Sequence, residues 1–318
     1  MKENSRVFLL AVCCAIFAAS GLCAATAKIT LRVVDEVGRP MGAFPVNAGF
    51  YAGDAFKGKT DTNGLFVMEG KTIHWEVNWM LKDVGYYRSY GKYEFKHGGK
   101  KDKWEPWDPV VTTVVRRIEN PVPMYAKRVE TVLTATNRWH GFDLEVGELT
   151  RPDGNGTVTD LLFRVDGAWK NYRENSSMLR LSFCCPLDGA VPESSGTSEC
   201  EFKMSREAPK EGYERALEWR KMRTAMEGRG NDVYLNDLDN FNGSYFRTRT
   251  ETNETGAIIH ARYGKIRSGM AFGGAGTDGC YLRFTYYLNP SSNDRNMEFD
   301  PKRNLLKNLK STEEVRAP

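Results

Sequence analysis

"GKTDTNGLF", residues 58–66, joins two short alternating apolar segments and decides between two kinds of structure. Its Asp61, Asn63 and Gly64 could belong to a calcium loop or to a turn between β-strands. Aligning these residues with positions 3, 5 and 6 of an EF-type loop puts the cation Lys59 at position 1 and leaves position 12 without a carboxylate. This pattern excludes the calcium loop. Asp and Asn bond backbone groups just downstream and Gly accepts positive φ, so the stretch predicts a turn between strands.

Strand-like segments flank this turn. In the preceding stretch "KITLRVV", Ile29, Leu31 and Val33 alternate with polar residues, which is the two-residue period of a β-strand. The next stretch, "DEVGRP", has the Gly and Pro of a turn, and "AFPVNAGFY" returns to strand character. The start of the chain therefore predicts a compact β domain built from short strands.

These motifs resemble those of the carboxypeptidase regulatory-like module, a small transthyretin-like β-sandwich. The resemblance covers about residues 28–117, and the Gly-Tyr at Gly85–Tyr87 fits it as well. It implies an accessory or structural module that carries no catalytic residues. The matching residues are Val34, Asp35, Gly38, Pro40, Val46, Thr60, Asp61, Gly64 and Phe66.

The rest of the chain also has strand character. Pro121 and Pro123 force extended backbone and predict a linker at residues 118–126. Short strand-like segments separated by turn residues then predict a second antiparallel β-sandwich at 127–290. Residues 291–318 form a polar C-terminal tail whose last residues are expected to be disordered. The predicted fold class is all-β, with two sandwich-like antiparallel β domains.

One segment, residues 211–227, predicts a helix instead. It follows a proline and ends before Gly228, and Glu211 and Arg215 are spaced to pair at i,i+4. We expect this helix to pack across the second sandwich, and binding of a partner is the alternative. The residues of its apolar stripe are Tyr213, Ala216, Trp219, Met222 and Met226.

The N-terminus has the pattern of an export signal. Lys2 and Arg6 precede an uncharged apolar run, and Ala25 and Ala27 offer an A-x-A cleavage site. We expect residues 1–27 to be a signal peptide and the mature protein to be periplasmic or extracellular, with no membrane span after cleavage. A retained membrane anchor and a lipoprotein acylated at Cys23 are the alternatives.

Charge and cysteine content limit the classes of partner. The net charge is +4, and removal of two cations and one anion with residues 1–27 lowers it by one unit, which is too weak a bias to predict a nucleic-acid partner. Three of the seven cysteines leave with the signal. The others permit two disulfides in an oxidising compartment, and buried free thiols remain the alternative. They are Cys184, Cys185, Cys200 and Cys280.

Few residue patterns indicate chemistry. The histidines lack the spacing of a zinc hydrolase, the cysteines lack that of a structural zinc site, and no phosphate loop or nucleophile elbow occurs, so we expect no metal or cofactor. Asp143 and Glu145 share one face of a predicted strand, as the carboxylates of a secreted glycan hydrolase could. Same-strand carboxylates are also common on solvated sheet faces.

Residues 85–109 contain the densest group of aromatic side chains. Tyr86 and Tyr90 fall on the outer face of a predicted strand, and Trp104 and Trp107 could extend a platform there for sugar rings or partner side chains. The alternative is that these rings seal the junction between the two domains. Altogether the sequence predicts an exported, non-enzymatic structural or interaction protein whose partner is a protein or a polysaccharide. Carbohydrate binding through this platform and glycan hydrolysis are the alternatives.

Overall fold

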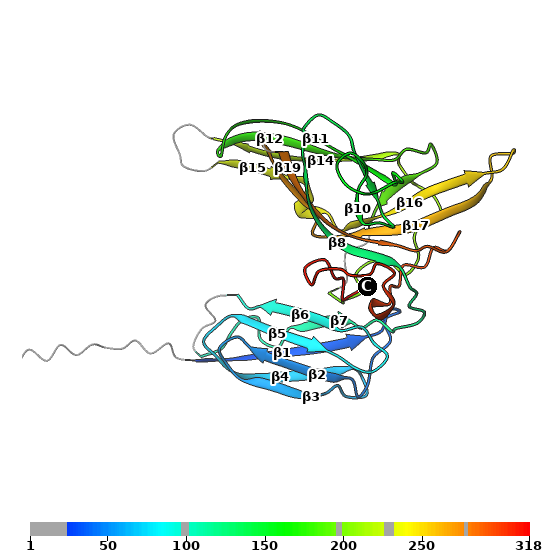
Figure 1. The fold of residues 1–318 in the computed structure, drawn as a ribbon. Coiled ribbons are helices and arrows are strands. Elements are labelled where there is room, and N and C mark those ends of the chain that lie inside the picture. The colour runs from blue at the N-terminus through cyan, green and yellow to red at the C-terminus, as the bar shows by residue number, and fades with distance from the viewer. Residues whose placement is uncertain (1–23, 97–101, 195–198, 226–231, 277–278) are drawn as a thin grey trace, which may run out of the picture.

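The computed structural model of the protein describes residues 24–96, 102–194, 199–225, 232–276 and 279–318. Within these ranges the regular structure consists of β-strands and two short 3₁₀ turns, η1 (Asp237–Asn240) and η2 (Pro301–Arg303). The predicted all-β class is therefore confirmed. Figure 1 shows two groups of strands, with the C-terminal segment lying between them.

The first group, which we call the N-terminal sheet pair, comprises a three-stranded and a four-stranded sheet. In the smaller sheet β1 (Ala25–Val34) lies between β4 (Leu65–Thr72), antiparallel to it, and β7 (Val110–Val114), parallel to it. The two sheets enclose one apolar core, which includes Ile29, Leu31 and Val33. The order of the smaller sheet is β4 (Leu65–Thr72), β1 (Ala25–Val34) and β7 (Val110–Val114); that of the larger is β3 (Ala55–Lys59), β2 (Pro45–Phe50), β5 (Glu76–Leu81) and β6 (Ser89–Glu94).

The turn expected at residues 58–66 is present between β3 and β4. The Asp61 carboxylate accepts hydrogen bonds from the backbone N–H groups of Asn63 and Leu65, at 2.9 and 2.8 Å. Gly64 has φ +74°, and a Cβ at this position would lie 2.5 Å from the carbonyl oxygen of Val33. Asp61 thus fixes the turn, and only glycine fits where the turn approaches β1.

The second group, the C-terminal sheet pair, comprises two six-stranded sheets. In one of them β8 (Tyr125–Leu133) is hydrogen-bonded along β19 (Gly279–Leu288). The first sheet contains β10 (Glu148–Leu149), β9 (His140–Asp143), β11 (Leu161–Asn171), β12 (Glu174–Ser182), β14 (Ala216–Thr224) and β15 (Val233–Asn236). The second contains β13 (Gly189–Pro192), β16 (Gly243–Thr252), β17 (Ile258–Arg267), β19 (Gly279–Leu288) and β18 (Ala271–Gly276), with β8 (Tyr125–Leu133) beside β19.

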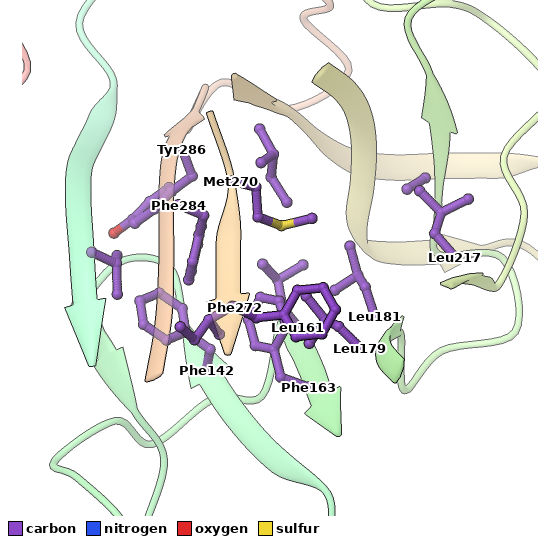
Figure 2. Close-up of a cluster of buried hydrophobic side chains, with 14 of the residues drawn as sticks. Phe142, Leu161, Phe163, Leu179, Leu181, Leu217, Met270, Phe272, Phe284 and Tyr286 are labelled. Atoms are coloured by element: carbon purple, nitrogen blue, oxygen red, sulfur yellow. The ribbon is translucent and has the colours of Figure 1, made fainter. Parts of the chain in front are cut away.

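Aromatic residues from both sheets fill the core of the C-terminal pair. Phe142 and Phe163 of the first sheet meet Phe284 of the second at ring-centroid distances of 5.3 and 5.1 Å (Figure 2). All three side chains are essentially inaccessible to solvent. Burial of such a phenylalanine contributes about 1.5–3 kcal/mol, so this cluster is a principal source of stability for the pair.

The predicted helix at 211–227 is wrong. Residues 216–224 form strand β14, which pairs antiparallel with β12 and β15. Leu217 and Trp219 point into the core, whereas Glu218 points outward and forms an ion pair with Arg180. The apolar residues of this segment fit both the two-residue period of a strand and the spacing of a helix. Backbone pairing with β12 and β15 selects the strand. Met226, the last residue of the predicted stripe, lies outside the described residues.

The C-terminal segment is ordered rather than a loose tail. Met297, Phe299 and Val315 are buried, and Phe299 packs on Tyr287 of β19 at 5.4 Å between ring centroids. Met124, at the predicted linker, joins the same cluster. The expected disorder of the last residues is therefore wrong. The C-terminal residues are mostly polar, but the few apolar side chains among them are buried and hold the segment in place.

The start of the described chain bears on the predicted cleavage site. Residues 1–23 lie outside the described residues, but Ala25–Ala27 already belong to β1 and pair with Gly70–Thr72 of β4. Ala27 is fully buried. Cleavage before Lys28 would thus remove three residues of a core strand. Among the described residues no helix has the length and apolar character needed to cross a bilayer.

Candidate functional site

The aromatic residues predicted to form one platform lie in separate places. Tyr86 packs edge-on against Phe44, with 5.2 Å between ring centroids, and is partly buried against the core of the N-terminal pair. Tyr90 is 41% exposed on β6. Trp104 packs against the N-terminal core, and Trp107 lies just beyond it in the chain.

Tyr90 and the two tryptophans occupy opposite ends of β6. The Tyr90 N–H donates to the carbonyl of Glu199, whereas Lys96, just beyond the strand, pairs with Glu105 beside the tryptophans. Lys96 lies six positions after Tyr90 along an extended segment, which corresponds to about 20 Å. A single platform of all four rings is therefore not formed.

The two carboxylates considered for glycan hydrolysis are already engaged. Asp143 is 1% exposed, and its oxygens accept hydrogen bonds from the N–H groups of Thr157 and Val158, each at 3.0 Å. Glu145 forms ion pairs with Arg249, at 2.9 Å, and with Arg262. These contacts stabilise the loop after β9 and leave little of either carboxylate to a substrate.

The four cysteines are free in the structure, so the disulfide alternative is not met. Cys184 and Cys185 follow β12, whereas Cys280 lies in the core of the C-terminal pair. Cys200 belongs to a separate small cluster beside Tyr87. Burial raises the pKa of the Cys200 and Cys280 thiols, which keeps them protonated and unreactive.

A site that the sequence did not identify lies where the two sheet pairs meet. Its centre is Phe202, whose ring is fully buried. The guanidinium groups of Arg116 and Arg206 lie 4.3 and 5.5 Å from the ring centroid, and the Tyr87 ring lies 5.3 Å away. We call Phe202, these three residues and Glu298 the Phe202 junction.

Glu298 gathers several segments at this junction. Its side chain is 2% exposed, and Oε1 accepts hydrogen bonds from the Tyr87 hydroxyl at 2.7 Å and from the Glu119 N–H at 2.9 Å. Oε2 accepts from the Asn120 N–H at 2.8 Å, and Arg206 Nη1 is 3.2 Å from Oε1. Glu298 therefore ties the segment before β6, the residues predicted as a linker and the C-terminal segment together. Burial, followed by the bond to Glu298, raises the pKa of Tyr87.

Arg116, which follows β7 of the N-terminal pair, also joins separate segments at this junction. Its Nη1 donates to the carbonyl oxygens of Phe202 and Met204, each at 2.6 Å, and its Nε donates to Glu36 at 2.8 Å. Glu36 also accepts from Arg206 at 2.6 Å. Burial raises the pKa of Glu36, but the hydrogen bonds from the two arginines outweigh it and hold that pKa below its usual range.

Local patterns could not have revealed this junction. Tyr87 and Glu298 are separated by 211 residues, and Arg116 and Phe202 by 86. Glu298 stands in an Asn-rich polar stretch, and Phe202 in an ordinary alternating one. The alternative that the platform rings seal a domain junction named Tyr86, Tyr90, Trp104 and Trp107, and did not include Tyr87, the residue that bonds to Glu298.

No protein-family model matches the chain, and no curated protein matches it. Among solved structures it aligns with BcpA, the major pilin subunit of Bacillus cereus, at 9% identity and a TM-score of 0.23, over 73% of this chain and 91% of that one. A protein of unknown function from Bacteroides fragilis NCTC 9343 aligns at 8% identity and a TM-score of 0.21, over 85% of this chain and 99% of that one. At such TM-scores neither likeness carries an argument.

Proposed function

We propose that this chain is an exported, non-enzymatic structural or interaction protein built from two β domains held in a fixed relation. The first, residues 28–117, is a carboxypeptidase regulatory-like module, and the second is the sandwich at 127–290. The observation that carries the proposal is the Phe202 junction. A partly buried network of ion pairs and hydrogen bonds loses contacts when any partner moves, so it opposes hinge motion between the domains.

The engaged carboxylates support the non-enzymatic part. A glycosidase needs an acid and a base that reach the scissile bond from both sides. Asp143 is buried under backbone donors and Glu145 is paired with two arginines. Both side chains therefore contribute to the loop after β9, and a structural role accounts for them.

Two measurements on purified residues 24–318 test the proposal. Small-angle scattering should fit one rigid arrangement of the two domains over a range of salt concentrations. Incubation with a panel of plant, bacterial and animal polysaccharides should release no reducing ends. A scattering curve that requires a broad ensemble of domain positions would contradict the fixed relation, and turnover lost in Glu145→Gln would replace the proposal with a hydrolase.

Export is tested separately in the producing cell. The full chain carrying a C-terminal epitope should appear in the envelope or in the medium. Recovery of the unprocessed chain in the cytoplasm, with none in those fractions, would contradict the export part alone.

A further inference from the structure

Three adjoining hollows cross the side of the molecule where the C-terminal segment meets β8 and β19. The first, of about 310 Å³, lies along Val132 and Tyr281. The second, of about 550 Å³, shares Arg283 with it. The third, of about 370 Å³, shares Lys203 and Arg267 with the second and reaches Tyr90 of the N-terminal pair. Shared walls make these hollows one continuous surface, which we call the basic groove.

Positive charge is concentrated in the middle hollow. Its only acidic residue, Glu314, is engaged by Arg316 at 3.0 Å. Within the described ranges Lys203, Arg267 and Arg283 form no ion pair. The cations that line this hollow are Arg128, Lys203, Arg267, Arg283 and Arg316.

These cations lie close enough to affect one another. Burial, followed by the charge of Arg267, lowers the pKa of Lys203. Several like charges facing one hollow raise its positive potential and attract an anion. An anionic ligand in the middle hollow would relieve this repulsion, whereas the outer two hollows also carry the carboxylates of Glu130, Glu199 and Glu201.

An exposed tyrosine lies at each end of the basic groove. Tyr281 is 49% exposed at the β19 end, and Tyr90 is 41% exposed at the other. Tyr281, Arg283 and Thr285 alternate along one strand and share its outer face, at intervals of about 6.7 Å. A ring face, a cation and a hydroxyl therefore follow one another along the path of a ligand.

We propose that the basic groove binds an acidic polysaccharide, whose carboxylate or sulfate groups meet Lys203, Arg267 and Arg283 and whose sugar rings stack on Tyr281 and Tyr90. Tyrosine rings combine a flat apolar face with a polar edge, which suits sugar rings. Arginine forms bidentate hydrogen bonds with carboxylate and sulfate-like groups. The site differs from the predicted Tyr/Trp platform, of which it contains only Tyr90.

Two other anionic polymers fit the groove less well. Single-stranded nucleic acid is held by rings on which successive bases stack, whereas here the exposed rings lie at opposite ends with cations between them. An acidic peptide added as a strand would need an unpaired edge, and β19 is already paired with β8 on one edge and with β17 and β18 on the other. The inference rests on the proposed interaction role, for which it names the partner class.

The experiment is calorimetric titration of residues 24–318 with polygalacturonate, heparin, neutral dextran, polyglutamate and oligothymidylate, at low and at raised salt. We expect binding to polygalacturonate or heparin that weakens with salt, and none to dextran. The first two probes distinguish carboxylate from sulfate as the recognised group. Arg283→Ala should weaken binding about three- to tenfold, and Tyr281→Ala should weaken it without changing the salt dependence.

Arg32→Ala is the matched control, because Arg32 is an exposed strand arginine of the N-terminal pair, remote from the groove. It should bind as the wild type does. Absence of binding to both acidic polysaccharides would overturn the inference. Binding of dextran, polyglutamate or oligothymidylate as tight as that of the acidic polysaccharides would also overturn it. So would unchanged affinity of the Arg283→Ala variant. None of these outcomes affects the scattering result, so failure of the groove and failure of the proposed function are distinguishable.

Discussion

Gly64 and Gly38 have similar backbone angles in different surroundings. Both have positive φ, +74° and +83°, but a Cβ on Gly64 would lie 2.5 Å from the Val33 carbonyl oxygen, whereas a Cβ on Gly38 would meet nothing within 4 Å. We therefore expect Gly64→Ala to destabilise the protein by about 2–4 kcal/mol, from backbone strain and overpacking together. Gly38→Ala should cost only about 1 kcal/mol.

Urea unfolding of both variants checks this difference. The slope of the unfolding free energy against urea should be unchanged, so that the shift in midpoint reports stability alone. Equal midpoints for the two variants would show that the turn before β4 can move away from β1. The sequence predicted this turn because its determinants lie within a few residues, but it could not show that Val33 is the neighbour.

Lys265 is the buried charge with the clearest consequence for pH dependence. It is 1% exposed, and Nζ donates to the Met297 carbonyl at 2.8 Å. Burial, and then the charges of Arg267 and Arg116, lower its pKa well below the ordinary value, against an opposing contribution from Glu298. Between the lowered pKa and the ordinary one, the unfolded chain binds more protons than the folded chain. Stability from this group must therefore rise with pH through that window.

Comparison of wild type with Lys265→Met isolates the effect. Relative to the variant, the wild type should gain up to about 1.4 kcal/mol per pH unit within the window. Urea unfolding at several pH values up to about 10 measures this, because 10.4 is the approximate unperturbed lysine pKa. Lys57→Met, at an exposed strand position, should track the wild type. A wild-type advantage that stays constant with pH would mean that Lys265 remains charged in the fold.

At the scale of elements, β14 shows how one stretch of sequence can fit both the period of a helix and that of a strand. Tyr213, Ala216 and Trp219 recur at helical spacing, and the same stretch alternates at Leu217 and Trp219. A helix would have been self-sufficient in backbone hydrogen bonds, whereas the strand depends on β15, the next strand along the chain, and on β12, from which β13 separates it in the sequence. The stretch itself offers both periods, and the partner strands that decide between them lie outside residues 211–227.

The first residues of β1 permit a test at the same scale. A chain that starts at Lys28 loses the pairing of Ala25–Ala27 with β4 and two backbone bonds of Thr26, one from its N–H to Asp102 at 2.7 Å and one to its carbonyl from Trp104 at 2.9 Å. It also loses the buried Ala27. We expect it to be about 2–4 kcal/mol less stable than a chain that starts at Ala24.

Chemical denaturation of the two chains measures this difference, and mass spectrometry of the exported protein locates the natural N-terminus. We expect that terminus to lie upstream of Ala25. A mature chain beginning at Lys28, with unchanged stability, would show that these residues are dispensable and would restore the cleavage site that the A-x-A pattern predicts.

At the scale of the whole molecule, the Phe202 junction determines whether the two domains behave as one body. Replacing Glu298 with alanine removes one carboxylate beside Arg206, which keeps its contact with Glu36, and leaves the Tyr87 hydroxyl and two backbone N–H groups without an acceptor. A buried donor left without its acceptor costs about 1–3 kcal/mol. We therefore expect Glu298→Ala to lower stability by about 2–4 kcal/mol and to expose residues 118–126 to proteolysis.

Glu207→Ala provides the matched comparison. Glu207 lines the same side of the molecule as Glu298 and pairs with Arg295 at 2.7 Å, but its side chain is 68% exposed. Its loss should cost less than about 1 kcal/mol and leave proteolysis unchanged. A double-mutant cycle of Glu298→Ala with Tyr87→Phe should give a coupling of about 0.5–3 kcal/mol, because the two side chains share a buried bond. Glu298→Ala could instead lower the free energy of unfolding no more than Glu207→Ala does and leave the scattering curve of the wild type unchanged. In that case apolar contacts alone hold the domains together, and the ionic network does not contribute.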